Sequence, residues 1–571
     1  MNMRRIIRSV LVGAIVGCST ASALADVKLN SLFTDNMVLQ RDIPAKVFGT
    51  ADDGESVIVS INGQTAKTTA KGGEWLVALK PMKAGGPHRL TIEGKNTLIL
   101  QNVVFGDVWL CTGQSNMDFD CAWFASPDKR QDEYRDEYGV QRKKYIEIAK
   151  HAARYKNLRM FVAEKRPGAK RAGLEAVKAF DKSWQVSAEK YTLLTSAMGY
   201  VFGLRLHQHL NIPIGLIDTN KSGSPIETWM SAEALKAAGL KAEADSHYNG
   251  NIFPVQKFAI KGVIWYQGES NAKTVESSIA YGRTFPTMIE SWRKEWGQGD
   301  FPFLYVQLAG WDWNESVRRN WPLLRESQDK ALALPNVGAA LAIDKGARRN
   351  IHPIHKIIVS ERLVLAARKH AYGEDLVCSG PTYKSYEVRG GKIEVVFDHV
   401  GGGLIKKAFQ IEDVKTTSAK LEGFELSADG HSYFPAEATI QGDKVVVSSD
   451  AVKSPKHLRY AWTGFPKANL FNKADLPAHP FRTDGADSPA TDPAVRMKAW
   501  DHHVKLRESS IFKDVAWTAV GPRIQGGKIE SIWSVKKRKS TLYVGSGSGN
   551  LWKSVNNGTT WKPIFESEST S

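Results

Sequence analysis

Hydrophobic and polar residues alternate in short runs over residues 27 to about 105. Examples are Ala45–Gly49, Val57–Ile61 and Leu90–Ile92, and the second of these is followed by the turn pair Asn62-Gly63. Alternation over about four to eight residues, bounded by turn residues, is typical of strands with one buried face. The pattern predicts a small antiparallel β-sandwich domain over residues 26–105.

The pattern changes near residue 106, where apolar runs begin to alternate with helical patterns. The runs that predict strands are Val104–Leu110, Ile214–Asp218, Gly262–Tyr266, Phe303–Leu308 and Val337–Ile343. Strands that alternate with helices favour a mainly parallel sheet covered by helices, so residues 106–375 are predicted to form a three-layer α/β/α domain.

Two segments of this region predict helices. One has apolar side chains at helical spacing, namely Tyr281, Phe285, Met288, Ile289, Trp292 and Trp296. Because proline lacks a backbone N–H, Pro286 is expected in the first turn of that helix. The other segment, Asp128–Lys156, is charged and helix-prone. It predicts either a solvated surface helix or an insertion that covers the site as a lid.

The last two hundred residues return to β-type runs. Ile393–Phe397 and Lys444–Val447 predict a second β-sandwich over residues 376–485, and the stretch Asp484–Ala490 predicts a linker. Beyond it, residues 554–561 resemble an Asp-box, the turn motif of β-propellers, with Asn556 where aspartate is usual. A propeller needs several blades to close, so residues 486–571 are predicted to be a linker and a partial propeller-like blade.

Length and composition narrow the function classes. The chain has 571 residues, which is too long for one core and predicts several domains. Its formal net charge is +17, but lysine and arginine are spread along the chain and no nucleic-acid motif is present. A solvated basic surface is therefore favoured over a nucleic-acid site. Seventeen tryptophans suit either sugar-binding surfaces or a core.

The amino terminus has the pattern of a targeting segment. It opens with three positive charges, Arg4, Arg5 and Arg8. A short apolar run, Val10–Gly17, and the small-residue site Ala23–Ala25 follow, which predicts a signal peptide over residues 1–25 and an exported, periplasmic or extracellular protein. The run is too short to span a membrane. The alternative is a bacterial lipoprotein box, Ile15–Cys18, with a lipid anchor on Cys18.

Cleavage after Ala25 leaves three cysteines, Cys111, Cys121 and Cys378. An odd number is not a disulfide framework, although Cys111 and Cys121 are either paired with each other or packed as thiols. Their spacing is not that of metal ligands, so we expect neither a metal nor a cofactor.

Four blocks between residues 106 and 356 carry polar side chains suited to chemistry. They are Gly106–Met117, Ile214–Trp229, Lys261–Asn271 and Asn350–Pro353 followed by Lys356. Three blocks follow a predicted strand directly, and the fourth lies a short loop after one. Because the carboxyl ends of parallel strands converge on one crevice, we expect these blocks to form one site. Within the first block a serine, Ser115, stands between two side-chain amides.

Together the blocks resemble the sialate O-acetylesterase family of SGNH-type serine hydrolases, over roughly residues 27–480. The resemblance implies an α/β hydrolase that removes acetyl groups from sugar hydroxyls through an acyl-enzyme, without a metal. It makes Ser115 the nucleophile and His352 the general base, in preference to the nearby His355.

The resemblance also implies the groups that stabilise the oxyanion. They are the backbone N–H of Ser115, the backbone of Gly223 and the side-chain amide of Gln267. Glu269 and Asn271 are expected to hold the third block by hydrogen bonds.

Two positions depart from the family pattern. Asn350 stands where the family commonly has an aspartate ahead of the Ile-His-Pro block, and Ser222 stands where it usually has glycine. An asparagine can orient a histidine but cannot stabilise its positive form as a carboxylate does. Asp344 or Glu269 would then serve as the acid, or the enzyme would act through a serine–histidine dyad.

We therefore predict an exported carbohydrate O-acetylesterase acting on sialic acid or other acetylated glycans. One alternative is an acetylxylan or related polysaccharide deacetylase on the same scaffold. The other is a catalytically weakened or inactive glycan-binding protein, which the Asn350 departure favours.

Overall fold

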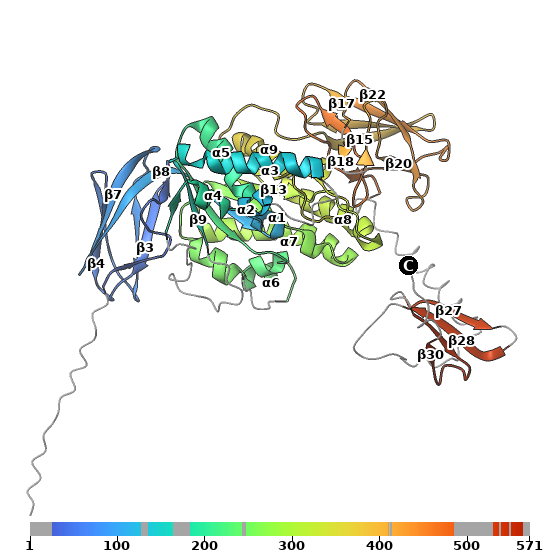
Figure 1. The fold of residues 1–571 in the computed structure, drawn as a ribbon, viewed down its shortest axis with the longest axis horizontal. Helices are drawn as coiled ribbons and strands as arrows, with labels where there is room; N and C mark the ends of the chain where they lie inside the picture. Colours follow the sequence, from blue (N-terminus) through green and yellow to red (C-terminus); the bar gives the residue numbers. More distant parts are fainter. Residues whose placement is uncertain are drawn as a thin grey trace, which may run out of the picture. The chain divides into compact units, whose positions relative to one another are not determined.

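The computed structural model describes residues 26–126, 135–163, 183–241, 247–408, 410–411, 414–484, 529–535, 538–546 and 550–563. The chain forms two compact units, Met1–Gly485 and Ala486–Ser571 (Figure 1). The predicted signal peptide, Cys18, the first part of the predicted lid and the linker after Asp484 lie outside the described residues.

The first unit begins with two sheets that pack as a sandwich. One sheet contains β1 (Lys28–Leu29), β3 (Ala45–Thr50) and β6 (Glu74–Leu79). The other contains β2 (Val38–Gln40), β4 (Ser56–Ile61), β5 (Gln64–Thr69) and β7 (Gly85–Glu93), joined by β8 (Thr97–Gly113). Buried and more exposed residues alternate along β4 and β6, as expected for strands with one face on a core.

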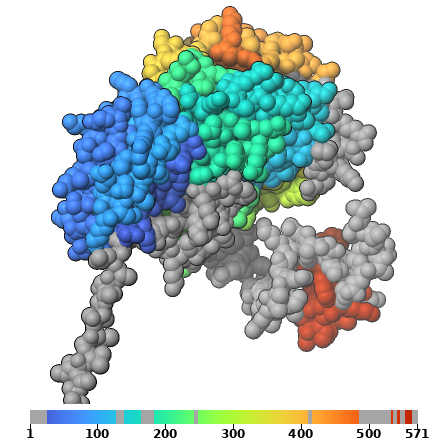
Figure 2. Space-filling view, turned by 60° about the vertical axis from the view of Figure 1, so that its left-hand side comes forward, coloured from blue at the N-terminus to red at the C-terminus, as the bar shows by residue number. Residues whose placement is uncertain are grey.

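Strand β8 connects the sandwich to the rest of the unit. It pairs with β7 and β2 near its start and with β11 and β12 near its end. Its last eleven residues are all buried, because both faces of the sheet are covered there. The domain boundary predicted at residues 105/106 therefore falls inside one continuous strand. Figure 2 shows the sandwich in direct contact with the α/β region.

The central sheet has the order β10-β9-β11-β8-β12-β13-β14. Its strands besides β8 are β9 (Leu158–Val162), β10 (Gln185–Val186), β11 (Ile214–Asn220), β12 (Gly262–Tyr266), β13 (Phe303–Gln307) and β14 (Val337–Leu341). All neighbours are parallel except the β10–β9 pair. The five predicted strands are present, whereas β9 and β10 were not predicted. The chain passes to one side of β8 for β9 and β11 and to the other for β12–β14, so β8 is the topological switch point.

Helices cover both faces of this sheet (Figure 1). On one face lie α5 (Ala197–Leu210) and α9 (Lys356–His370), and on the other lie α6 (Ala232–Ala237) and α7 (Val275–Trp296). Helix α8 (Glu315–Asp329) packs against α7. The remaining helices are α1 (Ser115–Asp118), α2 (Cys121–Ala125), α3 (Arg135–Lys150) and α4 (Glu189–Leu193). Helix α3 falls in the segment predicted as a surface helix or lid.

The predicted position of Pro286 is wrong, because the residue lies in the middle of α7 rather than in its first turn. A capping box of Thr274 and Ser277 starts the helix well before the proline. An interior proline costs about 3 kcal/mol. The helix tolerates it because large side chains such as Phe285 and Trp292 are fully buried beside it.

The first unit ends in a second group of sheets. One contains β15 (Thr382–Arg389), β16 (Lys392–Asp398), β23 (Lys444–Ser448) and β22 (Glu437–Gln441). Another contains β21 (Phe434–Pro435), β20 (Phe424–Ser427), β24 (His457–Tyr460) and β26 (Phe481–Arg482). Two short pairs are β17 (Leu404–Lys406) with β25 (Leu470–Asn472), and β18 (Gln410–Ile411) with β19 (Val414–Lys415).

The second unit contains an antiparallel sheet of β27 (Ile529–Val535), β28 (Arg538–Ser546), β29 (Asn550–Ser554) and β30 (Lys562–Pro563). Its Asp-box-like turn is held by Asn556, whose Oδ1 accepts the backbone N–H of Thr560 at 2.9 Å. That this sheet is a propeller blade stays a prediction.

Candidate active site

The serine and the histidine chosen from the sequence lie in contact. Ser115 opens α1 directly after β8, at the carboxyl edge of the sheet, and His352 lies in the loop between β14 and α9. The Nε2 atom of His352 is 2.9 Å from the Oγ atom of Ser115. A nucleophile in hydrogen-bond contact with a base is the basic unit of serine catalysis. His355, the alternative base, lies instead at the N-cap of α9.

The turn that presents Ser115 is fixed by its backbone. Gly113 has φ +141°, and a Cβ atom there would collide with the carbonyl oxygen of Tyr266. The N–H of Gln114 donates to that same oxygen at 2.9 Å. The Gln114 Oε1 atom accepts the N–H groups of Gly268 and Ser270 at 3.3 and 3.2 Å. The first and third blocks are therefore locked together beside Ser115.

The loop after β11 lies beside α1. The backbone N–H and the hydroxyl of Ser222 both donate to Oδ2 of Asp118, at 2.9 and 2.6 Å. The next residue, Gly223, is exposed and has φ +74°. In the described part of the chain, neither the N–H of Ser115 nor that of Gly223 donates to a protein acceptor. Both remain available to a substrate oxygen, and Ser222, in place of the family's glycine, anchors this loop.

Gln267 lies in a buried network. Its Nε2 atom donates to the carbonyl of Ser224 at 3.1 Å and to Oδ1 of Asn271 at 2.7 Å. Its Oε1 atom accepts the hydroxyl of Tyr281 at 2.8 Å. A side-chain amide has only two hydrogens to donate. The oxyanion role predicted for Gln267 would therefore require its amide to leave one of these acceptors.

Asn271 holds two loops together, as expected for a supporting residue. Its Nδ2 atom donates to both carboxylate oxygens of Glu227 at 2.9 and 3.0 Å. Its Oδ1 atom accepts the N–H of Ile226 at 2.9 Å. Glu227 was not singled out from the sequence, although it lies in the second block.

Two of the groups considered for orienting His352 have other partners. Asp344 is buried and forms two hydrogen bonds with Arg362, at 2.6 and 2.8 Å. Burial raises the pKa of Asp344, but the charge and hydrogen bonds of Arg362, together with the charge of Lys345, lower it by more, so the net shift of the pKa is downward. The Oδ1 atom of Asn350 accepts the backbone N–H of His352 at 2.9 Å, so it holds the loop and not the ring.

Glu269 contacts Asn116, the residue after the nucleophile. The Nδ2 atom of Asn116 donates to Oε1 of Glu269 at 2.5 Å and to the carbonyl of Ile351 at 3.0 Å. Its Oδ1 atom accepts from Nζ of Lys356. Among the described residues, no carboxylate forms a hydrogen bond with the His352 ring. The geometry is that of a dyad.

His352 has an unusual environment for a base. Its ring meets that of Phe119 edge-on, with centroids 4.6 Å apart. Burial and the charge of Lys356 lower the pKa of His352 to about 4. The imidazole is therefore neutral at ordinary pH, which is the form that can accept the serine proton.

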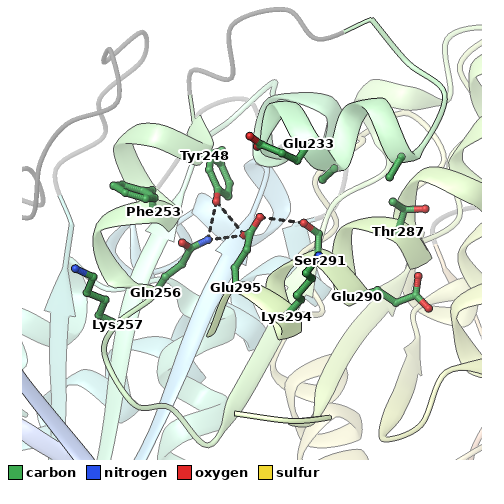
Figure 3. Close-up of a pocket in the computed structure, with 12 residues that line it drawn as sticks. Glu233, Tyr248, Phe253, Gln256, Lys257, Thr287, Glu290, Ser291, Lys294 and Glu295 are labelled. Carbon is green, nitrogen blue, oxygen red and sulfur yellow. Dashed lines mark hydrogen bonds between the residues drawn. The ribbon is translucent and has the colours of Figure 1, made fainter. Parts of the chain in front are cut away.

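A separate pocket lies between α6 and the second half of α7 (Figure 3). It has a volume of about 670 Å³. Its polar groups bond to one another, since Glu295 accepts from Tyr248, Gln256 and Ser291 at 2.9, 2.6 and 3.0 Å. It contains none of the residues of the four blocks singled out from the sequence.

Three further features bear on the chemistry. Cys111, Cys121 and Cys378 are free thiols, so Cys111 and Cys121 are packed rather than paired. Within the described ranges, no group of His, Cys, Asp or Glu is arranged to hold a metal ion. No helix in that part of the chain is long and apolar enough to cross a membrane.

The fold and the site define the class of protein, an ester hydrolase on a parallel α/β sheet. A family model described as "Carbohydrate esterase, sialic acid-specific acetylesterase" matches residues 105–356. Human sialate O-acetylesterase is 30% identical over 510 residues, covering 79% of this chain and 91% of the human protein. The chain belongs to the sialate O-acetylesterase family of carbohydrate esterases.

Two more relatives support the same family assignment. The rat sialate O-acetylesterase is 30% identical over 542 residues, covering 79% of this chain and 93% of its own. A solved carbohydrate acetylesterase from Xanthomonas citri is 37% identical with a TM-score of 0.71, and the match covers 80% of this chain and 99% of that one. Each of these matches covers about four-fifths of this chain.

Proposed function

We propose that this protein hydrolyses acetyl esters on sugar hydroxyls through an acetyl-serine intermediate on Ser115. The observation that carries the proposal is the 2.9 Å contact between His352 Nε2 and Ser115 Oγ at the switch point of the sheet. Membership of a carbohydrate esterase family supports the substrate class.

In the first half of the reaction, His352 accepts the proton of Ser115 as its oxygen attacks the acetyl carbonyl. The N–H groups of Ser115 and Gly223 stabilise the negative oxygen that forms. The protonated His352 then gives its proton to the sugar oxygen, and the sugar alcohol leaves. In the second half, His352 deprotonates a water that attacks the acetyl-serine, and acetate leaves as Ser115 regains its proton.

The substrate proposed first is an O-acetylated sialic acid, since relatives at 30% identity are sialate O-acetylesterases. Acetylated xylan is the second candidate, because the Xanthomonas citri relative is described only as a carbohydrate acetylesterase. Acetate release from each substrate separates them. We expect kcat/KM to favour the sialic acid by at least about tenfold, and the reverse order would establish the polysaccharide deacetylase.

A serine-directed phosphonate tests the nucleophile and the glycan-binding alternative together. We expect wild type to gain one adduct on the peptide that contains Ser115, and Ser115→Ala to gain none. An unlabelled, folded wild type that also releases no acetate would favour a glycan-binding protein without catalysis.

We further propose that the protein is exported after cleavage behind Ala25. The support is the order of positive, apolar and small residues over positions 1–25. The intact mass of the protein from its native host tests this. A mature chain beginning at Asp26 is expected, and a diacylglyceryl group on Cys18 would establish the lipoprotein instead.

A further inference from the structure

Lys356 stands at a place where a lysine is normally unfavourable. It is 1% exposed and is the first residue of the fifteen-residue helix α9. Burial disfavours an ammonium group, and the positive end of the helix dipole disfavours it further. A lysine that is both buried and at the amino end of a helix is unfavourable for stability on two counts, which points to a role in function.

The contacts of Lys356 lead to both members of the dyad. Its Nζ atom donates to Oδ1 of Asn116, the residue after Ser115. The Nδ2 atom of Asn116 donates to the carbonyl of Ile351, the residue before His352, at 3.0 Å. The side-chain amide of Asn116 therefore joins the turn that carries Ser115 to the loop that carries His352. Because the Lys356 ammonium can only donate, it holds the oxygen of that amide toward itself and the NH₂ group toward Ile351.

The charge of Lys356 is balanced locally. Asn116 Nδ2 also donates to Oε1 of Glu269, so ammonium, amide and carboxylate form one buried chain. The Nζ atom lies 5.2 Å from the ring centroid of Tyr266, at the end of β12. The ionisable groups that face Lys356 are thus Glu269 on η6 (Glu269–Asn271), Tyr266 on β12 and His352 in the preceding loop.

We propose that Lys356 is a positioning residue for the Ser115–His352 pair and acts through Asn116. In this protein the buried Lys356–Asn116–Glu269 chain does the aligning that a carboxylate bonded to the histidine ring performs in a triad. It differs from a triad acid in one respect: it fixes the loop of the base without stabilising a positive imidazole. The inference rests on the proposed function, because it presumes that Ser115 and His352 are the reacting groups.

The test compares Lys356→Met with wild type on 4-nitrophenyl acetate. We expect kcat to fall about 10- to 100-fold with KM within about threefold, since small misplacements of reacting groups lower the chemical step. We also expect the acid limb of kcat/KM to move to higher pH, because the Lys356 charge lowers the pKa of His352. A lysine with no part in aligning the pair would leave kcat unchanged, although the loss of its charge would still move the acid limb.

A double variant separates positioning from charge balance. Lys356→Met leaves Glu269 buried without its cation, and adding Glu269→Gln removes that charge. We expect the double variant to regain thermal stability but not kcat. If kcat returned with stability, Lys356 would serve only to neutralise Glu269 and the proposal would be overturned.

Two controls complete the experiment. Arg362→Lys changes another buried cation of α9, one that pairs with Asp344, and should leave kcat within about twofold. If Lys356→Met does not fold, Asn116→Ala removes the joining amide without a change of charge and must show the same loss of kcat. An active wild type, an inactive Ser115→Ala and a fully active, folded Lys356→Met would overturn this proposal alone. An inactive wild type would overturn the proposed function itself.

Discussion

At the scale of single residues, the site is governed by how His352 is kept neutral. Burial and the charge of Lys356 both act against its protonated form. Among the described residues, no carboxylate acts in the opposite direction on its ring. In the proposed mechanism, His352 is therefore a weak base that stays neutral, and so able to accept the Ser115 proton, over a wide pH range.

This predicts the acid limb of the pH profile. The rate should fall only as His352 becomes protonated near pH 4, below the ordinary value of 6.5. At pH 5 a base with a pKa of about 4 is about 90% neutral, against about 3% for an unshifted histidine. The measurement is kcat/KM for 4-nitrophenyl acetate between pH 3.5 and 8, with thermal stability followed in parallel. A limb between pH 6 and 7 in the folded enzyme would contradict this account.

The sequence predicted the proposed nucleophile and base, and Glu269 as a supporting residue, but not the contacts that join them. Ser115 and His352 lie in blocks that a family resemblance can assign one by one. The bond from Lys356 to Asn116 joins residues 240 positions apart, and Glu227 acts through a similar long-range contact with Asn271. Such pairings depend on how the strands are ordered in space, which no local pattern contains.

At the scale of elements, the runs of apolar residues predicted the strands of the central sheet wherever no charged residue interrupted the run. Strand β9 was not predicted because Arg159, the second of its five residues, interrupts the apolar run. That arginine is 3% exposed and donates to backbone carbonyls, including that of Asn36 at 3.0 Å. An arginine can be buried when backbone carbonyls accept its hydrogen bonds. A hydrophobic pattern that treats every charged residue as exposed therefore misses such a strand.

Two loops at the carboxyl edge of the sheet, one after β13 and one after β14, are joined by backbone hydrogen bonds. The N–H of Ala347 donates to the carbonyl of Gly310 at 3.1 Å, and the N–H of Asp312 donates to that of Arg348 at 2.9 Å. Trp313, which follows Asp312, is 64% exposed. An exposed indole on the loop that pairs with the segment ahead of His352 offers a face for a sugar ring.

We therefore expect Trp313→Ala to affect glycans and not small esters. KM for an O-acetylated sugar should rise about five- to tenfold, which corresponds to roughly 1–1.4 kcal/mol of lost contact. The value of kcat/KM for 4-nitrophenyl acetate should stay within about twofold. Trp533→Ala, at a tryptophan of the second unit that is 76% exposed, is the matched control. Equal effects of Trp313→Ala on both substrates would rule out a sugar contact.

At the scale of the whole molecule, the first unit contains every residue assigned to the site. The sequence predicted a domain boundary at the end of each sandwich. The linker predicted at residues 484–490 lies outside the described residues apart from Asp484, and the division between the two compact units falls after Gly485. The boundary at residue 105 is crossed by β8, because a single strand is shared by sandwich and central sheet.

A chain that ends at Gly485 should therefore keep the chemistry. We expect its kcat/KM for 4-nitrophenyl acetate to lie within about twofold of the full-length value, since Ser115, His352 and Lys356 belong to the first unit. Circular dichroism and thermal unfolding show whether the shortened chain folds. A folded, shortened chain with a tenfold lower rate would mean that residues 486–571 contribute to catalysis.

The most direct measurement is hydrolysis of 4-nitrophenyl acetate by wild type, Ser115→Ala and His352→Ala side by side. We predict turnover by wild type and a loss of about 10³-fold or more in kcat/KM for each variant, with unchanged thermal unfolding, because the two side chains act as one unit. Wild-type turnover that survives either substitution would contradict the assignment of Ser115 and His352 as nucleophile and base.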